Sequence, residues 1–203
     1  MHLVSDFDDT LTNTTKYWNF WLEKLVGIGI DRNKAIDVGA RLFVKGFTLQ
    51  RHMELLGVSD SIAQQLMNEM MGHVKELGKD YVFPDVPMFL SQHHKSHSFS
   101  LLTYGDEGNQ LWRVAESGIA SFFSPVRIAG PDKHKVEHLK DVLKMETRVI
   151  FVDDSPNELN PVVDAGLPIK LYRIVRSGAK HDYPHERDDV AWKRISSFDQ
   201  IVF

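Results

Sequence analysis

Short apolar runs alternate with amphipathic segments along most of this chain. Five runs have the composition of strands: residues 3–5, 99–102, 126–129, 149–152 and 169–174. Between the last four runs lie segments with apolar residues at helical spacing, such as Val136, Leu139 and Val142 in one and Leu111 and Val114 in another. Strands that alternate with helices predict a parallel sheet with helices on both faces, whose ligand site lies beyond the carboxyl ends of the strands.

Residues 14–83 break this alternation. They contain no convincing strand and predict four consecutive helices, the first with Trp18, Trp21, Leu22 and Leu25 on one face. The predicted fold is therefore α/β, a Rossmann-like parallel sheet core with an inserted all-helical cap domain. The core comprises residues 1–13 and 84–203, and the cap comprises residues 14–83. Because the insert begins beside a cluster of acidic residues, it is a candidate lid.

Composition narrows the class of protein. The 203 residues carry a formal net charge of −4 and include no Cys, which excludes disulfides, thiolate metal sites and a Cys nucleophile. The chain starts MHLVSDFDD, which is not a signal peptide, and no apolar run approaches the ~18 residues of a membrane span. We expect a soluble cytoplasmic protein with no membrane and no nucleic-acid partner.

Polar residues follow four of the predicted strands. They are Asp6, Asp8 and Asp9; Thr103, Tyr104 and Gly105; Lys133; and Asp153 and Asp154, with Glu158 four residues beyond. Acids from two strands that converge on one point suggest a hard cation such as Mg²⁺. Lys133 and Thr103 could hold an anion that the metal also touches, and this combination describes phosphoryl transfer.

Four segments resemble the motifs of the haloacid dehalogenase-like (HAD) hydrolase superfamily. DFDDTLT is similar to its first motif, SLLTYG to its second, GPDKHKV to its third and VIFVDDSPNE to its fourth. Their order and spacing hold over residues 2 to about 175. The helical insert between the first and second motifs matches the position of the cap in one branch of the superfamily.

The resemblance implies a role for each position. Asp6 would be the nucleophile that forms an aspartyl-phosphate, and Asp8 would be the general acid and then the base. Thr103 would hydrogen-bond the phosphoryl oxygens, beside Tyr104 and Gly105, and Lys133 would balance their charge. Asp6, the backbone carbonyl of Asp8 and an acid of the fourth motif would bind Mg²⁺. Asp9 would instead be structural, pointing away from the site and capping the following turn.

Two registers remain open. In the fourth motif Asp154 aligns with the metal ligand, because Glu158 then falls where a second acid often sits, and Asp153 is the second choice. In the third motif Lys133 places the apolar residues of the following helix on the core face, and Lys135 is the alternative.

Asp8 narrows the range of reaction types that the resemblance implies. Within the superfamily, an acid two residues after the nucleophile indicates hydrolysis of a phosphate monoester or phosphate transfer within a sugar phosphate. Hydrolysis is the commoner activity, so we expect a Mg²⁺-dependent phosphatase. A sugar-phosphate mutase and a catalytically silent phosphate-binding regulatory protein are the alternatives.

Substrate specificity has no motif. A lid needs surface facing its site, so Tyr17, Lys45 and Arg51 of the insert are candidate substrate-binding residues, together with Thr12 just before it. Helical spacing favours the core of the insert for Tyr17, and a solvated turn is as plausible for Lys45 and Arg51. Because a cap would exclude a folded protein, we expect a small phosphorylated molecule as substrate and a monomer or homodimer as the assembly.

Three other features of the sequence could suggest a binding site, but a simpler structural interpretation is expected for each. The histidines at 93, 94 and 97 are expected in a solvated turn rather than a zinc site, since no acid or Cys accompanies them. His134 and His138 are four apart on a helix, but a metal role is not expected. The basic segment 172–194 is expected to be a surface loop, because its acids neutralise much of its charge.

Overall fold

The sheet lobe is built on six parallel strands. The structure is a computed structural model that describes residues 1–43, 47–179 and 192–203. The strand order is β3-β2-β1-β4-β5-β6, and each neighbouring pair is parallel. The strands are β1 (His2–Ser5), β2 (Ser98–Tyr104), β3 (Val126–Ala129), β4 (Val149–Asp153), β5 (Ile169–Ile174) and β6 (Trp192–Ile195). This arrangement confirms the predicted α/β class.

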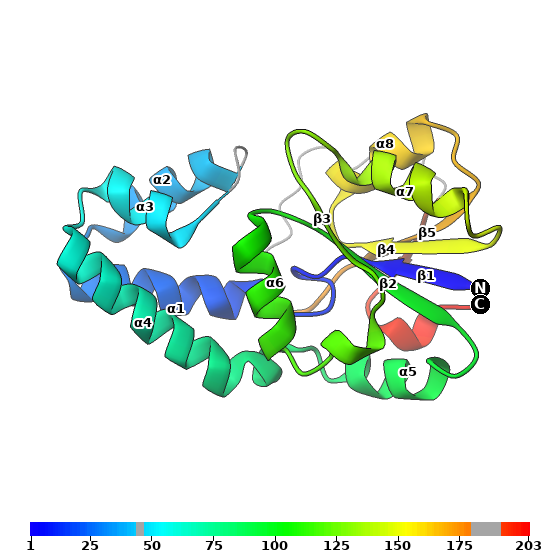
Figure 1. Cartoon of the computed structure of the whole chain (residues 1–203), viewed down its shortest axis with the longest axis horizontal. Coiled ribbons are helices and arrows are strands. Elements are labelled where there is room, and N and C mark those ends of the chain that lie inside the picture. The colour runs from blue at the N-terminus through cyan, green and yellow to red at the C-terminus, as the bar shows by residue number, and fades with distance from the viewer. Residues whose placement is uncertain (44–46, 180–191) are drawn as a thin grey trace.

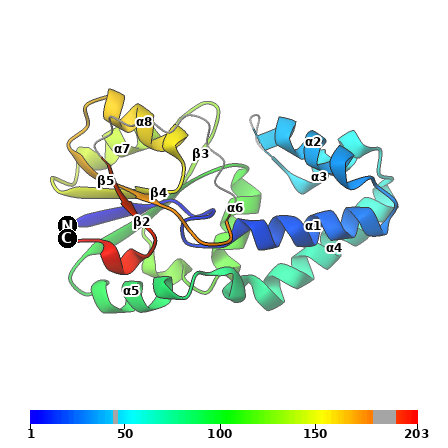
Figure 2. The same cartoon turned by 180° about the vertical axis from the view of Figure 1, so that it is seen from behind.

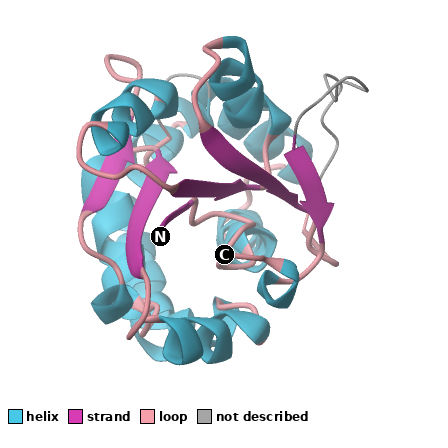
Figure 3. Ribbon diagram, turned by 90° about the vertical axis from the view of Figure 1, so that its right-hand side faces the viewer, coloured by secondary structure: helices cyan, strands magenta, loops and turns pink. Residues whose placement is uncertain are grey.

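Helices cover both faces of the sheet (Figures 1 and 3). The helices of this lobe are α5 (Asp85–His93), α6 (Glu107–Glu116), α7 (Lys135–Leu143) and α8 (Pro156–Asp164). Successive strand residues point to opposite faces, so Leu3 joins the apolar cluster with α5 and Val4 joins the cluster with α7 and α8. Both faces are therefore dry, as a parallel sheet requires.

The helical insert, predicted over residues 14–83, lies beside the sheet lobe, at the far end from the two termini (Figures 1 and 2). Its helices are α1 (Thr14–Gly27), α2 (Arg32–Phe43), α3 (Leu49–Leu56) and α4 (Asp60–Leu77). They enclose an apolar cluster of their own, which includes Trp21, Leu22 and Leu25 from the predicted face of α1. None of the helices among the described residues has the length and hydropathy to span a membrane.

Two details differ from the sequence prediction. The sixth strand, β6, was not predicted because only Ile195 of its four residues is buried, as is usual at a sheet edge. In α6 the predicted apolar face is wrong in part, since Leu111 is exposed whereas Gln110, Arg113 and Val114 are buried. The polar pair on this buried face belongs to the candidate site.

Candidate active site

Three carboxylates converge at the carboxyl ends of β1 and β4. These strands pair in parallel with Ser5 opposite Val152, so the next residues, Asp6 and Asp153, lie beside each other. One oxygen each of Asp6, Asp153 and Asp154 lie within 4.8 Å of one another, and all three residues are buried. The structure thus brings together both candidates of the fourth motif with the first aspartate.

Lys135, not Lys133, meets these carboxylates. Its Nζ donates to Asp6 Oδ1 at 2.6 Å and to Asp153 Oδ2 at 2.8 Å, and its side chain is 3% exposed. Lys133 instead pairs with Asp141 at 2.6 Å on the surface, with its side chain 46% exposed. The prediction that Lys133 enters the site is therefore wrong.

The local backbone explains this register. Gly130 and Lys133 exchange backbone hydrogen bonds in a tight turn, and α7 begins only at Lys135. The His134 backbone N–H donates to Glu137 Oε2, which fixes this helix start. Lys135 therefore stands at the first helical position and faces the sheet.

Burial raises the pKa values of two carboxylates in this group even though Lys135 pairs with both. Burial and the nearby Asp153 and Asp8 raise the pKa of Asp6 to about 7, although Lys135 opposes the shift. Burial and Glu158 likewise raise the pKa of Asp153 to about 6 against Lys135. Burial lowers the pKa of Lys135, but the facing carboxylates outweigh it and raise that pKa well above its usual value. Lys135 alone therefore does not restore the ordinary pKa values of Asp6 and Asp153, and the buried oxygen donors of this group suit a hard divalent cation.

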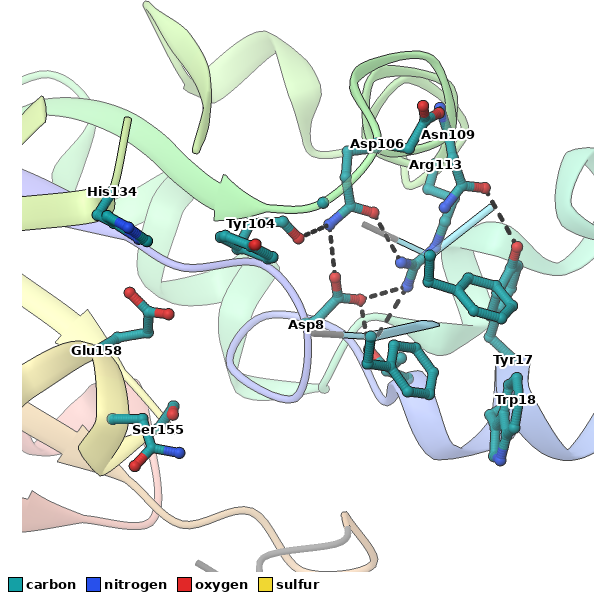
Figure 4. Close-up of a pocket in the computed structure, with 16 residues that line it drawn as sticks. Asp8, Tyr17, Trp18, Tyr104, Asp106, Asn109, Arg113, His134, Ser155 and Glu158 are labelled. Atoms are coloured by element: carbon teal, nitrogen blue, oxygen red, sulfur yellow. Dashed lines mark hydrogen bonds and ion pairs between the residues drawn. The ribbon is translucent and has the colours of Figure 1, made fainter. Parts of the chain in front are cut away.

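Asp8 lies in a different environment. Its Oδ1 is 2.6 Å from Arg113 Nη2 and accepts from Thr14 Oγ1 at 2.6 Å, and its Oδ2 accepts from Gln110 Nε2 at 2.7 Å (Figure 4). Burial raises the pKa of Asp8, but the Arg113 guanidinium and these hydrogen bonds outweigh it, so the pKa lies below its ordinary value. The structure therefore holds Asp8 as a carboxylate.

Gln110 links Asp8 to the end of β2. Its Nε2 also lies 2.8 Å from Thr103 Oγ1, and Thr103 is fully buried. Gly105 adopts a φ of 150°, and a Cβ built there would lie 3.2 Å from Gln110 Cγ. A side chain at position 105 would therefore strain the backbone and crowd this amide.

Gln110 and Arg113 are site residues that the sequence analysis missed. Both stand three residues apart on the buried face of α6, and the Arg113 guanidinium lies over the rings of Phe7 and Tyr17. The sequence does hold one indication of them: two polar residues at i and i+3 just after the second motif, on the same side of the helix as the apolar Val114.

Two cavities meet at this site. A small cavity of about 180 Å³ is lined by Asp6, Asp8, Asp9, Thr103, Tyr104, Lys135, Asp153, Asp154, Ser155 and Glu158. A larger cavity of about 610 Å³ extends toward the helical insert and is also lined by Asp8, Tyr104, Ser155 and Glu158. Figure 4 shows Asp8 between Glu158 and Ser155 on one side and Tyr17 and Trp18 on the other.

The remaining predicted residues divide between this site and other places. Tyr17 and Gly105 line the larger cavity. Thr12 is buried and lines neither cavity, since its hydroxyl donates to the Phe7 carbonyl within the turn. Arg51 also lines neither cavity and pairs with Glu54 on the surface. Lys45 lies outside the described residues.

Asp9 has the capping role that was predicted for it. Its Oδ1 accepts from the backbone N–H of Thr14, the first residue of α1. Its backbone φ is 54°, an uncommon value for a residue other than glycine. It does not point fully away from the site, because it also lines the small cavity.

The histidines and the basic segment considered above can also be located. Among the described residues, the aspartate group brings three possible metal ligands together, and none of the five histidines belongs to it. The interpretation of segment 172–194 as a surface loop is wrong for Arg173 and Arg176, which are 1% and 4% exposed. Residues 180–191 of that segment lie outside the described residues.

Comparisons with known proteins agree with this architecture. The family model described as "Hydrolase: haloacid dehalogenase-like hydrolase" matches residues 1–166, most of the 203-residue chain. The chain therefore belongs to the haloacid dehalogenase-like hydrolase family. The comparison with curated proteins found no match.

Solved structures share the fold at low sequence identity. A provisionally named HAD hydrolase, YfnB from Bacillus subtilis, bound to magnesium, has a TM-score of 0.68 and 14% identity over 98% of this chain and 95% of its own. A predicted phosphoglycolate phosphatase from Haemophilus somnus 129PT has a TM-score of 0.62 and 14% identity over 95% and 92%. A provisionally named β-phosphoglucomutase from Thermotoga maritima has a TM-score of 0.60 and 17% identity over 97% and 94%. At these identities the likeness concerns the fold alone.

Proposed function

We propose that this hydrolase is a Mg²⁺-dependent phosphate monoesterase that acts through an aspartyl-phosphate on Asp6. The observation that carries the proposal is the small cavity, in which Asp6 meets Lys135 and Asp153 while Asp8 stands at the border with the larger cavity. The small cavity accepts a phosphoryl group, and the larger cavity accepts the leaving group.

The site residues act in two chemical steps, formation of the aspartyl-phosphate and its hydrolysis. Asp6 attacks phosphorus in line, while the buried Lys135 ammonium and the Thr103 hydroxyl stabilise charge on the phosphoryl oxygens. The Asp8 carboxylate takes the proton of a monoprotonated phosphate ester, passes it to the leaving oxygen and then accepts one from the hydrolytic water. Since Arg113 and Gln110 bind the Asp8 carboxylate, we propose that they orient it toward the junction of the two cavities.

The aspartate group fits Mg²⁺. Its donors are carboxylate oxygens only, they are buried, and burial raises the pKa of Asp6 to about 7. Asp6, the Asp8 carbonyl and Asp154 would hold the ion, with Asp153 shared between the ion and Lys135. The ion would supply charge stabilisation to the transferring phosphoryl group. Asp6 would then be ionised at neutral pH, as a nucleophile must be.

The helical insert would serve as a cap. Residues of α1 and α2 line the larger cavity opposite the strand ends, so movement of the insert would control access of substrate and water. We propose a cytoplasmic enzyme, active as a monomer or homodimer on a small phosphorylated molecule, with no nucleic-acid or membrane partner. The net charge of −4 supports this exclusion of polyanionic partners.

Phosphate release is the direct test. Purified protein is incubated with a panel of phosphate monoesters, with Mg²⁺ or with a chelator, and inorganic phosphate is measured. We expect turnover that needs Mg²⁺, is lost in Asp6→Asn and persists in Asp141→Asn, a control at an exposed carboxylate on α7. Conversion of one sugar phosphate into its isomer without net phosphate release would favour the mutase. Binding of the esters without either reaction would favour the silent regulatory protein.

A further inference from the structure

The larger cavity differs chemically from the small one that it adjoins. Tyr17 and Trp18 come from α1, Phe43 ends α2, and Phe47 precedes α3, so one wall is aromatic. A volume of about 610 Å³ is ample for a ring-bearing leaving group. By contrast, the small cavity of about 180 Å³ is lined mainly by charged and polar residues.

The aromatic wall is preassembled. The ring of Trp18 meets those of Phe43 and Phe47 edge-on, at centroid distances of 5.3 and 5.6 Å. Phe43 and Phe47 stack at 4.8 Å. Phe43 nevertheless stays 50% exposed and lies outside the apolar cluster of the insert, so its ring is not needed to fill that cluster. An exposed ring beside a cavity offers a surface that another ring can cover.

The charged residues that line the larger cavity, within the described part of the chain, are mostly acidic. Asp8, Asp106 and Glu158 are acids, the guanidinium of Arg113 is bound to Asp8, and His134 is the other lining residue that can carry positive charge. A second carboxylate or phosphate on the substrate would therefore meet negative side chains here. Asn109 and the Tyr17 hydroxyl, which hydrogen-bond each other, are neutral polar groups on the same cavity.

We propose that the preferred substrate is a phosphate monoester whose leaving group carries an uncharged aromatic ring, seated against Trp18, Phe43 and Phe47. This inference rests on the proposed phosphatase function. The phosphoryl group occupies the small cavity, Asp8 lies beside the bridging oxygen, and the ring fills the larger cavity.

Three alkyl esters test the preference without a large change in leaving-group basicity. They are 2-phenylethyl phosphate, ethyl phosphate and 2-phosphoglycolate. Burial of one phenyl ring predicts a kcat/KM for the first ester that is roughly 10- to 100-fold above that of ethyl phosphate. Phosphoglycolate should be the poorest of the three. Equal or reversed ranking among esters that are hydrolysed in an Asp6-dependent manner would overturn the inference and leave the phosphatase proposal standing.

Two variants connect the preference to the wall. Phe43→Ala should lower the ratio of phenylethyl to ethyl phosphate turnover by about 3- to 10-fold. Leu55→Ala, at an exposed apolar residue of α3 outside the cavity, should leave the ratio unchanged. An unchanged ratio in Phe43→Ala would contradict this seat for the ring.

Binding gives a readout that needs no turnover. Calorimetric titration of Asp6→Asn with the same esters should show tighter binding of 2-phenylethyl phosphate than of ethyl phosphate, and a smaller difference in Asp6→Asn/Phe43→Ala. If no ester is hydrolysed by the wild type, the phosphatase proposal fails. Ring-independent binding would also overturn the inference about the ring.

Discussion

At the scale of single residues, the position of one ammonium group decides the electrostatics of the site. Lys135 bridges Asp6 and Asp153, whose carboxylates would otherwise repel each other in a buried place. Lys133, only two residues earlier, neutralises Asp141 on the surface. The two lysines therefore form a natural pair of test and control.

Replacement of Lys135 should abolish most of the activity. In Lys135→Met the long side chain is kept without its charge. We expect kcat/KM to fall by about 100-fold or more, because the proposed mechanism uses this charge to stabilise the phosphoryl oxygens. Lys133→Met should stay within about twofold of the wild type. Steady-state kinetics on one ester, after circular dichroism shows that both variants are folded, checks this. A larger loss in Lys133→Met would contradict the assignment.

The identity of the site lysine also shows what the sequence could not specify. Asp6, Thr103 and Asp154 follow apolar runs, so their places at strand ends could be read from the pattern. The lysine lies on a helix whose start depends on the Gly130–Lys133 turn and on Glu137, and these are tertiary details of one connection. Hydropathy alone did not distinguish the two registers.

At the scale of elements, hydropathy did not predict the buried face of α6, because polar residues lie on that face. Gln110 and Arg113 would face solvent by hydropathy, yet they face Thr103 and Asp8, and Leu111 is exposed instead. The four insert helices were predictable because their own apolar faces meet one another. The edge strand β6 was not, because two of its four side chains are charged and only Ile195 is buried.

A neutral histidine stabilises the helical insert. His52 of α3 is fully buried, and its Nδ1 accepts from Trp21 Nε1 while Nε2 faces the Ala35 carbonyl at 2.8 Å. Protonation would place an N–H against the Trp21 N–H. Burial lowers the pKa of His52, although the bond to Ala35 opposes the shift.

This arrangement predicts a pH dependence of stability. Because the folded pKa lies below the unfolded value of about 6.5, the unfolded state binds more protons, and stability should fall as the pH drops below about 6.5. His52→Gln, whose amide can accept from Trp21 and donate to Ala35, should show a shallower loss of urea midpoint between pH 7.5 and 5.5. The exposed His94→Gln is the control. Parallel slopes in the wild type and His52→Gln would contradict the argument.

Arg176 contacts three separate parts of the sheet lobe: the start of α5, the turn that holds Thr10, and two aromatic rings. Its Nη1 lies 2.8 Å from both Asp85 oxygens at the start of α5, its Nε donates to the Thr10 carbonyl, and its guanidinium lies over the rings of Phe83 and Phe198. The residue was expected in a surface loop. Its burial shows that part of the basic segment has a structural role.

Arg176→Met should destabilise the protein by about 3–5 kcal/mol, because Asp85 would keep a mostly buried charge without this partner. Urea unfolding measures the change in the free energy of unfolding. Arg51→Met, which removes an exposed i,i+3 pair, should change it by no more than about 0.5 kcal/mol. A loss near 0.5 kcal/mol in Arg176→Met as well would show that the buried pair is not a major support of the fold.

At the scale of the whole molecule, the topology places the insert over the site. β1 lies between β2 and β4, so its aspartates are flanked by the ends of both neighbours. The chain then leaves for the insert and returns beside its exit, where Asn13 N–H donates to the Tyr81 carbonyl and Phe83 N–H to that of Leu11. Because the segments that leave and re-enter the sheet lobe are hydrogen-bonded to each other, the insert is attached through a short pair of segments close to Asp8.

We predict that a divalent cation bound to the carboxylate group stabilises the protein. The three buried carboxylates have oxygens within 4.8 Å of one another, and Lys135 bridges two of them, so a cation that binds this group only in the folded state should raise the unfolding temperature. At Mg²⁺ concentrations about 100 times the Kd, the linkage is worth about 2.7 kcal/mol, which corresponds to about 5–10 °C for a chain of this size. Calorimetric scans with Mg²⁺, with chelator, and with NaCl at equal ionic strength measure the increment.

Asp154→Asn separates this effect from a general response to salt. The variant should lose most of the Mg²⁺ increment, because one of the three carboxylates that would hold the ion is gone. Asp141→Asn, which changes an exposed carboxylate, should keep the full increment. If Asp154→Asn keeps it too, or if NaCl reproduces it in the wild type, the aspartate group does not bind the ion. The roles assigned to Asp6 and Asp8 would then need a different source of charge compensation.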